Sequence, residues 1–164
     1  MTDPDSSSQT GLAVVMTPGA RSATVQIVVD CADPLTQADW WAETLGWSVE
    51  PSDEPFIHSM ADQGLATPSD TTVHHGALVW AEGAAVRDPD GGAGTVRVLF
   101  VKVPEAKSVK NRVHLDVRRA GSDLAEARAA LEARGATFLH DGAQGPHRWV
   151  TMAGPEGNEF CVTQ

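Results

Sequence analysis

Residues 24–46, TVQIVVDCADPLTQADWWAETLG, carry the pattern that decides the fold. The β-branched, apolar run from Thr24 to Val29 predicts a strand. Asp33 then provides a helix N-cap, and Pro34 suits the first helical position, where no backbone N–H is needed. Leucines and alanines recur at helical spacing up to Gly46, which suits a left-handed helix end. This stretch therefore predicts a strand followed by a helix.

Residues 112–135, RVHLDVRRAGSDLAEARAALEARG, repeat the same plan. Val113, Leu115 and Val117 alternate with polar residues, which predicts a strand with one apolar face. Ser122 is the expected helix cap, and Gly135 is the expected helix end. The separation from cap to glycine is thirteen residues, as it is between Asp33 and Gly46. The chain is therefore predicted to contain a duplicated module.

The segments after each predicted helix also match. Each helix is followed by a short predicted strand, residues 47–50 and 136–140, and later by a proline–acid–glycine turn, residues 89–91 and 155–157. A β-rich segment follows each turn, residues 95–103 and 159–163. Both halves read strand, helix, strand, strand, strand. One such unit leaves a sheet face uncovered, so pairing two units is the economical solution.

The predicted fold class is therefore α+β, with two βαβββ modules forming a curved mixed sheet around a cleft. Module one is placed at residues 21–103 and module two at 111–164, together forming a single domain from residue 21. Residues 104–110 are the expected linker, and residues 51–72, rich in Ser, Asp and Pro, are an expected surface loop. A disordered tail is expected over residues 1–20.

Charge is the clearest signal in the composition. Twelve Lys and Arg against twenty-two Asp and Glu give a formal net charge of -10, which repels phosphate backbones and anionic lipid. We therefore expect no nucleic-acid or membrane partner. The two cysteines are too few for a disulfide framework, and the polar N-terminus has no signal-peptide pattern. A cytoplasmic protein is expected.

Several motifs resemble those of the vicinal-oxygen-chelate superfamily (glyoxalase, bleomycin resistance protein and dioxygenase), in particular the glyoxalase-like proteins of actinobacteria. They are Lys110 to Asp116, Trp149 to Met152, Pro155 to Val162, and the Trp40-Trp41 pair with Leu45-Gly46-Trp47. The resemblance covers about residues 23 to 164, with Gly154 standing where this subgroup usually has Asp. It implies the paired-module fold and a homodimer, but it does not settle the chemistry.

Metal-dependent relatives place His or Gln in the first strand of each module and a carboxylate in the last strand. The resemblance puts Gln26, Arg112 and Cys161 at three of these positions, and Leu99 or Phe100 at the fourth. Arg112 has no lone pair to donate and is always a cation. We therefore predict that the usual metal is absent and that no cofactor is needed. A displaced site formed by His114, Glu159 and Cys161 is the alternative.

Arg112, His114 and Asp116 are expected on one polar strand face. They form either a ligand-binding cleft, with Arg112 and His114 as catalytic candidates, or an ion-pair network that fixes the modules together. Trp149 is a candidate pocket wall or a core residue. His74 and His75 are expected to point to opposite faces of an extended segment and not to chelate together.

The preferred interpretation is a metal-free protein that binds a small-molecule ligand for sequestration, resistance or sensing. Its candidate ligand-binding residues are Gln26, Arg112, His114, Asp116, Trp149, Glu159 and Cys161. One alternative is a lyase or isomerase that uses Arg112 and His114. A second alternative is an interaction subunit whose cleft is filled by its own side chains.

Overall fold

The structure, a computed structural model, describes residues 24–92, 95–119, 121 and 123–164. Module one contains β1 (Gln26–Cys31), α1 (Pro34–Leu45), β2 (Ser48–Val49), β5 (Gly83–Arg87) and β6 (Arg97–Lys102). Its four-stranded sheet has the order β1-β6-β5-β2, with β1 parallel to β6 and the other pairs antiparallel.

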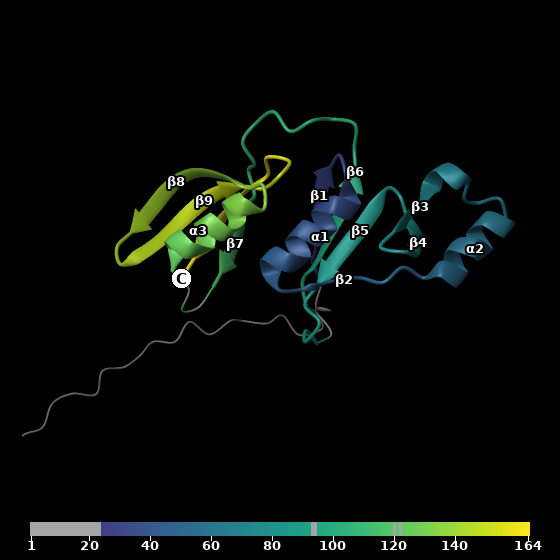
Figure 1. Ribbon diagram of the computed structural model, residues 1–164, viewed down its shortest axis with the longest axis horizontal. Coiled ribbons are helices and arrows are strands. Elements are labelled where there is room, and N and C mark those ends of the chain that lie inside the picture. The colour runs from purple at the N-terminus through teal and green to yellow at the C-terminus, as the bar shows by residue number, and fades with distance from the viewer. Residues whose placement is uncertain (1–23, 93–94, 120, 122) are drawn as a thin grey trace, which may run out of the picture.

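Module two repeats this topology. It contains β7 (Leu115–Arg118), α3 (Leu124–Ala133), β8 (Thr137–Gln144), β9 (His147–Ala153) and β10 (Glu159–Thr163). Its sheet has the order β7-β10-β9-β8, again with one parallel pair. Each module carries one long helix against its sheet, and the two modules lie side by side (Figure 1). The predicted α+β fold of two βαβββ modules is confirmed, as two separate mixed sheets.

The local signals at the first helix hold in detail. The Asp33 side chain accepts a hydrogen bond from the backbone N–H of Thr36 at 3.1 Å, and Gly46 has a φ of 69° at the helix end. In module two the capping residue is Asp123, which accepts from the backbone N–H groups of residues 125 and 126. Ser122, the predicted cap, and the predicted tail lie outside the described residues.

The second module's first strand begins later than predicted. β7 starts at Leu115, and Val113 lies in a bend with 79% of its surface exposed, so it is not part of an apolar strand face. In the two predicted turns, Gly157 has the expected positive φ of 85°, whereas Gly91 does not belong to the positive-φ glycines of the described chain. The Pro-acid-Gly pattern therefore marks the two turns correctly but does not fix their type.

The segment expected to be a surface loop is largely ordered. It contains α2 (Glu54–Asp62) and the 3₁₀ turn Pro68–Asp70, followed by the hairpin of β3 (Thr71–His74) and β4 (Ala77–Trp80). Asp53 caps α2 by accepting from the backbone N–H of Phe56 at 3.0 Å, and Ile57 is buried. The composition rich in Ser, Asp and Pro predicted a loop. In the structure, polar residues of this segment cap α2 and the 3₁₀ turn, and prolines occupy their first turns. This insertion lies at the far end of module one (Figure 1).

Aromatic side chains join the two modules. Trp40 and Trp41 of α1 both meet Phe160 of β10 edge-to-face, with ring centroids 5.8 and 5.0 Å apart. The Arg134 guanidinium, just past α3, donates to the backbone oxygen of Trp40 at 2.7 Å, and the Trp40 indole donates back to the Arg134 carbonyl at 2.9 Å. Buried residues of both modules consequently form one hydrophobic core. Among the described residues, no helix is long and apolar enough to cross a membrane.

The turn of module two also clamps module one. Glu156 accepts hydrogen bonds from the backbone N–H groups of Ala32 and Asp33, at 2.7 and 3.0 Å. These N–H groups lie between β1 and α1, where no ladder or helix partner is provided. A carboxylate accepting two backbone hydrogen bonds is a strong, charge-assisted contact. The Pro-Glu-Gly turn is therefore a cross-module contact as well as a chain reversal.

We expect Glu156→Gln to lower the free energy of unfolding by about 1–2 kcal/mol, because the amide keeps one acceptor but loses the charge. Urea denaturation followed by far-UV circular dichroism measures this. Glu82→Gln, at an exposed position, is the control and should change stability by less than about 0.5 kcal/mol. Equal changes in the two variants would show that the Glu156 contact contributes nothing.

Candidate functional site

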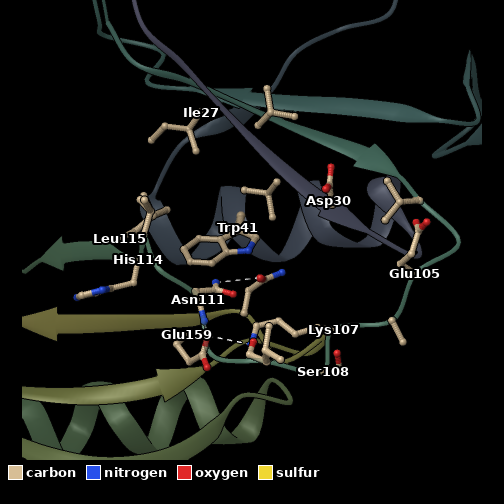
Figure 2. A pocket seen from close by; sticks show the side chains of 17 residues that line it. Ile27, Asp30, Trp41, Glu105, Lys107, Ser108, Asn111, His114, Leu115 and Glu159 are labelled. Atoms are coloured by element: carbon tan, nitrogen blue, oxygen red, sulfur yellow. Dashed lines mark hydrogen bonds and ion pairs between the residues drawn. The ribbon is translucent and has the colours of Figure 1, made fainter.

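A cavity of about 670 Å³ lies between the modules. One side is formed by residues 27–30 of β1, whose outer edge pairs with no strand of its own sheet, and by Trp41 of α1. The other side is formed by Val103, by linker residues 105–109 and by the segment leading into β7. The Trp41 ring lies in the middle of the cavity wall (Figure 2). A concave site at a module junction is the usual setting for a small-molecule site.

The polar end of the cavity is built around Glu159. Its carboxylate pairs with the Lys107 ammonium at 3.0 Å and accepts from the backbone N–H of Asn111 at 3.1 Å (Figure 2). Asn111 also donates through its side chain to Asn158 at 3.0 Å. Burial alone would raise the pKa of Glu159, but the hydrogen bonds from Lys107 and Asn111 outweigh it and hold the pKa below its ordinary value. Glu159 is therefore ionised at neutral pH.

The rest of the lining is mainly apolar with a negative excess. Valines 28, 109 and 113 line the cavity and are exposed to solvent, while Ile27, Trp41 and Leu115 form its inner wall. Three carboxylates, Asp30, Glu105 and Glu159, face one ammonium, Lys107, which leaves two negative charges in excess. This surface suits a ligand with an apolar body and a neutral or cationic polar group.

Gln26, the predicted first metal position, is occupied by an ion-pair network. Its side-chain oxygen accepts from the Arg97 guanidinium at 2.6 Å, and Arg97 also pairs with Glu50 at 2.7 Å. Strand register explains this contact, because Gln26 lies opposite Arg97 on the sheet face turned away from α1. Gln26 does not line the cavity between the modules.

Three of the predicted residues of module two lie together, and Arg112 lies apart from them. His114, Asp116 and Cys161 come together, with one ligand atom of each within 4.8 Å of the others, and the His114 and Asp116 side chains lie 3.4 Å apart. His114 also lines the rim of the cavity, with its imidazole directed away from Trp41 (Figure 2). Arg112 lies exposed in the bend before β7 and does not line the cavity.

Trp149 stands on the sheet face turned away from α3. The register pairs it with Gly142, where a Cβ atom would overlap the indole ring. Gly142 is therefore required for this close approach. Trp149 does not line the cavity, whereas Glu159 does.

The residues at the superfamily's metal position do not form a full ligand set. The Gln26 oxygen already contacts a guanidinium, and Leu99 offers no donor. Burial raises the pKa of Cys161, and the nearby Asp116 carboxylate raises it further. A hydrogen bond with Thr151 lowers the pKa, but by less, so it stays above its ordinary value. Cys161 therefore remains a neutral thiol, which is a poor metal ligand and a poor nucleophile.

Sequence reasoning missed the linker's contribution. The sequence places Lys107 in the expected linker and Asn111 in a family motif, with no role for either in the cavity. In the structure, both contact Glu159, which is a predicted ligand-binding residue that lines the cavity. One signal was present, because the eight residues from Glu105 to Arg112, between two predicted strands, include four charged side chains. No local pattern, however, indicates which strand edge such a linker will cover.

Comparison with known proteins agrees with this architecture. Residues 26–163 match the glyoxalase-like domain family, and the chain belongs to that family. Similar solved structures include a glyoxalase family protein from Bacillus cereus, with 12% identity, a TM-score of 0.57 and coverage of 90% of this chain and 97% of that one. The fosfomycin resistance protein FosX from Mesorhizobium loti has 9% identity, a TM-score of 0.56 and coverage of 90% and 92%.

A third similar structure is a member of the glyoxalase/bleomycin resistance protein/dioxygenase superfamily from Sphaerobacter thermophilus. It has 15% identity and a TM-score of 0.54, and the match covers 87% of this chain and 97% of that one. None of the curated proteins compared with the chain matches it in sequence. At these identities the likeness to solved structures establishes the superfamily fold and leaves the reaction and ligand open.

Proposed function

We propose that the protein binds a neutral or cationic small molecule in the cavity between its modules, without the superfamily's metal. The observation that carries this proposal is the cavity itself, of about 670 Å³, with an apolar wall around Trp41 and the Lys107–Glu159 pair at its polar end. An apolar surface with a few fixed polar groups is the usual composition of a ligand site. The two surplus carboxylates select against anionic ligands.

A thermal-shift screen with neutral and cationic compounds of drug size tests the proposal. A ligand that binds only the folded protein raises the melting temperature as its concentration rises above Kd. The matched variants are Val113→Trp and Val73→Trp, since both valines are exposed but only Val113 lines the cavity. We expect Val113→Trp to weaken a hit at least about tenfold by filling the cavity mouth, and Val73→Trp to leave its Kd unchanged.

Charge selectivity provides the second arm of this test. Asp30→Asn removes one of the cavity's carboxylates, so it should weaken cationic hits several-fold and leave neutral hits unaffected. The proposal fails if no compound in either class shifts the melting temperature, or if hits bind Val113→Trp as tightly as the unchanged chain.

The enzymatic alternative has less support from the geometry. A lyase or isomerase that uses Arg112 and His114 needs both side chains at one substrate, but Arg112 is exposed in a bend outside the cavity. The alternative of a subunit with a self-filled cleft is disfavoured by the open space between the modules.

The proposal extends to a homodimer, as the family resemblance implies. Supporting this, the exposed valines 28, 109 and 113 gather at the cavity mouth, where a second copy would remove them from water. Sedimentation equilibrium of the full chain should give twice the 17.3 kDa mass of one chain. A monomer at all concentrations would remove this part of the proposal and leave the ligand site standing.

A further inference from the structure

Three ligand-type side chains meet outside the cavity, where the insertion touches α1. Asp39 lies on α1, His74 ends β3, and His75 begins the turn to β4. The Nε2 atoms of both histidines lie 2.8 Å from the same Asp39 oxygen, Oδ2, and the two imidazole centroids are 4.1 Å apart. None of the three residues lines the cavity between the modules.

The sequence predicted that these neighbouring histidines diverge, and that prediction is wrong. Adjacent side chains point to opposite faces only while the backbone stays extended. His75 has a φ of 48°, which is the left-handed region and strained for a residue with a Cβ atom. Among the described residues other than glycine, His75 alone has a positive φ. This backbone turn brings its ring back beside that of His74, so strain and convergence occur at the same residue.

The donor set matches a transition metal. Two imidazole nitrogens and one carboxylate oxygen are ligands typical of zinc, copper, nickel and iron, and they are too few in oxygen for calcium. Zinc–nitrogen bonds of about 2.0–2.1 Å in a tetrahedron put ligand atoms about 3.3 Å apart. The three ligand atoms here already lie within 4.8 Å of one another, so small side-chain movements would suffice.

The surroundings favour a cation as well. The chain carries a net charge of -10. The Asp33 carboxylate is near enough to interact electrostatically with His74, so it adds a second negative group close to the site. His75 is 74% exposed, whereas Asp39 and His74 are about one-third and one-quarter exposed. The site is thus preformed and has an open side for water as a fourth ligand.

We propose that Asp39, His74 and His75 bind one divalent transition-metal ion that fastens the insertion hairpin to α1. The site is built from residues of the insertion and the outer part of α1, and it is independent of the cavity. Binding replaces the hydrogen bonds from both rings to Asp39, so each Nε2 must lose its proton and present its lone pair. The hairpin is already joined to α1 by the contacts of both histidines with Asp39, and the ion would strengthen that link.

Titration of the full, chelator-stripped chain with Zn²⁺ alone, in competition with a chromophoric chelator, tests the proposal. We expect one equivalent to bind. His74→Asn and His75→Asn should each weaken binding by about a hundredfold or more, since even the loss of a hydrogen bond that orients a metal ligand costs about 10–100-fold. His58→Asn and His140→Asn, at exposed positions elsewhere, are matched controls that should leave the affinity unchanged.

Hydrogen exchange gives a second readout that does not depend on the titration. Zn²⁺ should slow exchange of the backbone amides of β3 and β4 in the unchanged chain and leave them unaffected in His75→Asn. Circular dichroism of each variant confirms that it is folded before its affinity is compared.

Two outcomes would overturn the proposal. One is Zn²⁺ affinity in folded His74→Asn and His75→Asn equal to that of the unchanged chain. The other is a Co²⁺ complex with a thiolate-to-cobalt charge-transfer band, which would place the ion at Cys161 with His114 and Asp116. A histidine–carboxylate site gives cobalt d–d bands without that feature.

Discussion

Phe160→Ala is expected to lower the free energy of unfolding by about 3–5 kcal/mol, the range for removing a large aromatic side chain from a core. Phe160 is fully buried and its ring meets both Trp40 and Trp41 edge-to-face. Phe160 belongs to module two and the two tryptophans to module one, so the variant leaves a cavity in the buried interface between the modules. Such a loss is a large part of a typical domain's total stability.

Urea denaturation followed by far-UV circular dichroism and by tryptophan fluorescence measures the effect. Phe56→Ala is the matched control, because Phe56 is 50% exposed on α2 and meets only Trp80 among the described aromatic pairs. The control should lose less than about 1 kcal/mol. If Phe160→Ala were as stable as Phe56→Ala, the aromatic contact would not hold the modules together. Non-coincident transitions by the two probes would mean that the modules unfold separately.

Much of the fold could be predicted because its signals are local. Asp33, Pro34 and Gly46 define a helix by chemistry that acts within a few residues, and the same spacing recurs in module two. The insertion was harder to predict, because Asp53 and Pro55 start a helix with only nine residues and a single buried side chain, Ile57. Short helices of that kind depend on tertiary packing, which composition does not show.

The candidate site could be predicted only in part, because its members are brought together by strand register and by the linker. Alternation predicted Arg112, His114 and Asp116 on one polar strand face. The structure brings His114 and Asp116 together, with Cys161 beside them, but leaves Arg112 in the bend before β7. Alternation did not indicate that Arg97 would lie opposite Gln26 and donate a hydrogen bond to its side chain, because the two residues are 71 positions apart in the sequence. The approach of His75 to His74 could not be predicted for a different reason. It depends on a positive φ at His75, and the sequence gives no sign of such a φ at a non-glycine residue.

Stability should also fall by about 2 kcal/mol as the pH rises from about 9 to about 11, because of Cys31. Cys31 is buried, with 3% of its surface exposed. Burial, with the nearby carboxylates of Glu156, Asp33 and Asp30, raises its pKa from an ordinary value near 9 to about 11. In the unfolded chain the thiol loses its proton near pH 9, while the folded chain keeps it. The stabilisation is therefore complete below about pH 9 and is lost as the pH rises through the folded value.

The chain suits this measurement because it contains no tyrosine, so few other groups titrate in the same range. Urea midpoints at pH 8.5 and 11 give the loss of stability in the unchanged chain. The same two midpoints in Cys31→Ala give the part of that loss due to the lysines and Cys161. The alanine variant should start less stable at pH 8.5, because it loses buried volume, yet fall by about 2 kcal/mol less between the two pH values. Thiolate absorbance near 240 nm supplies the matching titration. Parallel pH profiles for the two chains would mean that Cys31 ionises as readily in the folded protein as in the unfolded one, which its burial beside three carboxylates argues against.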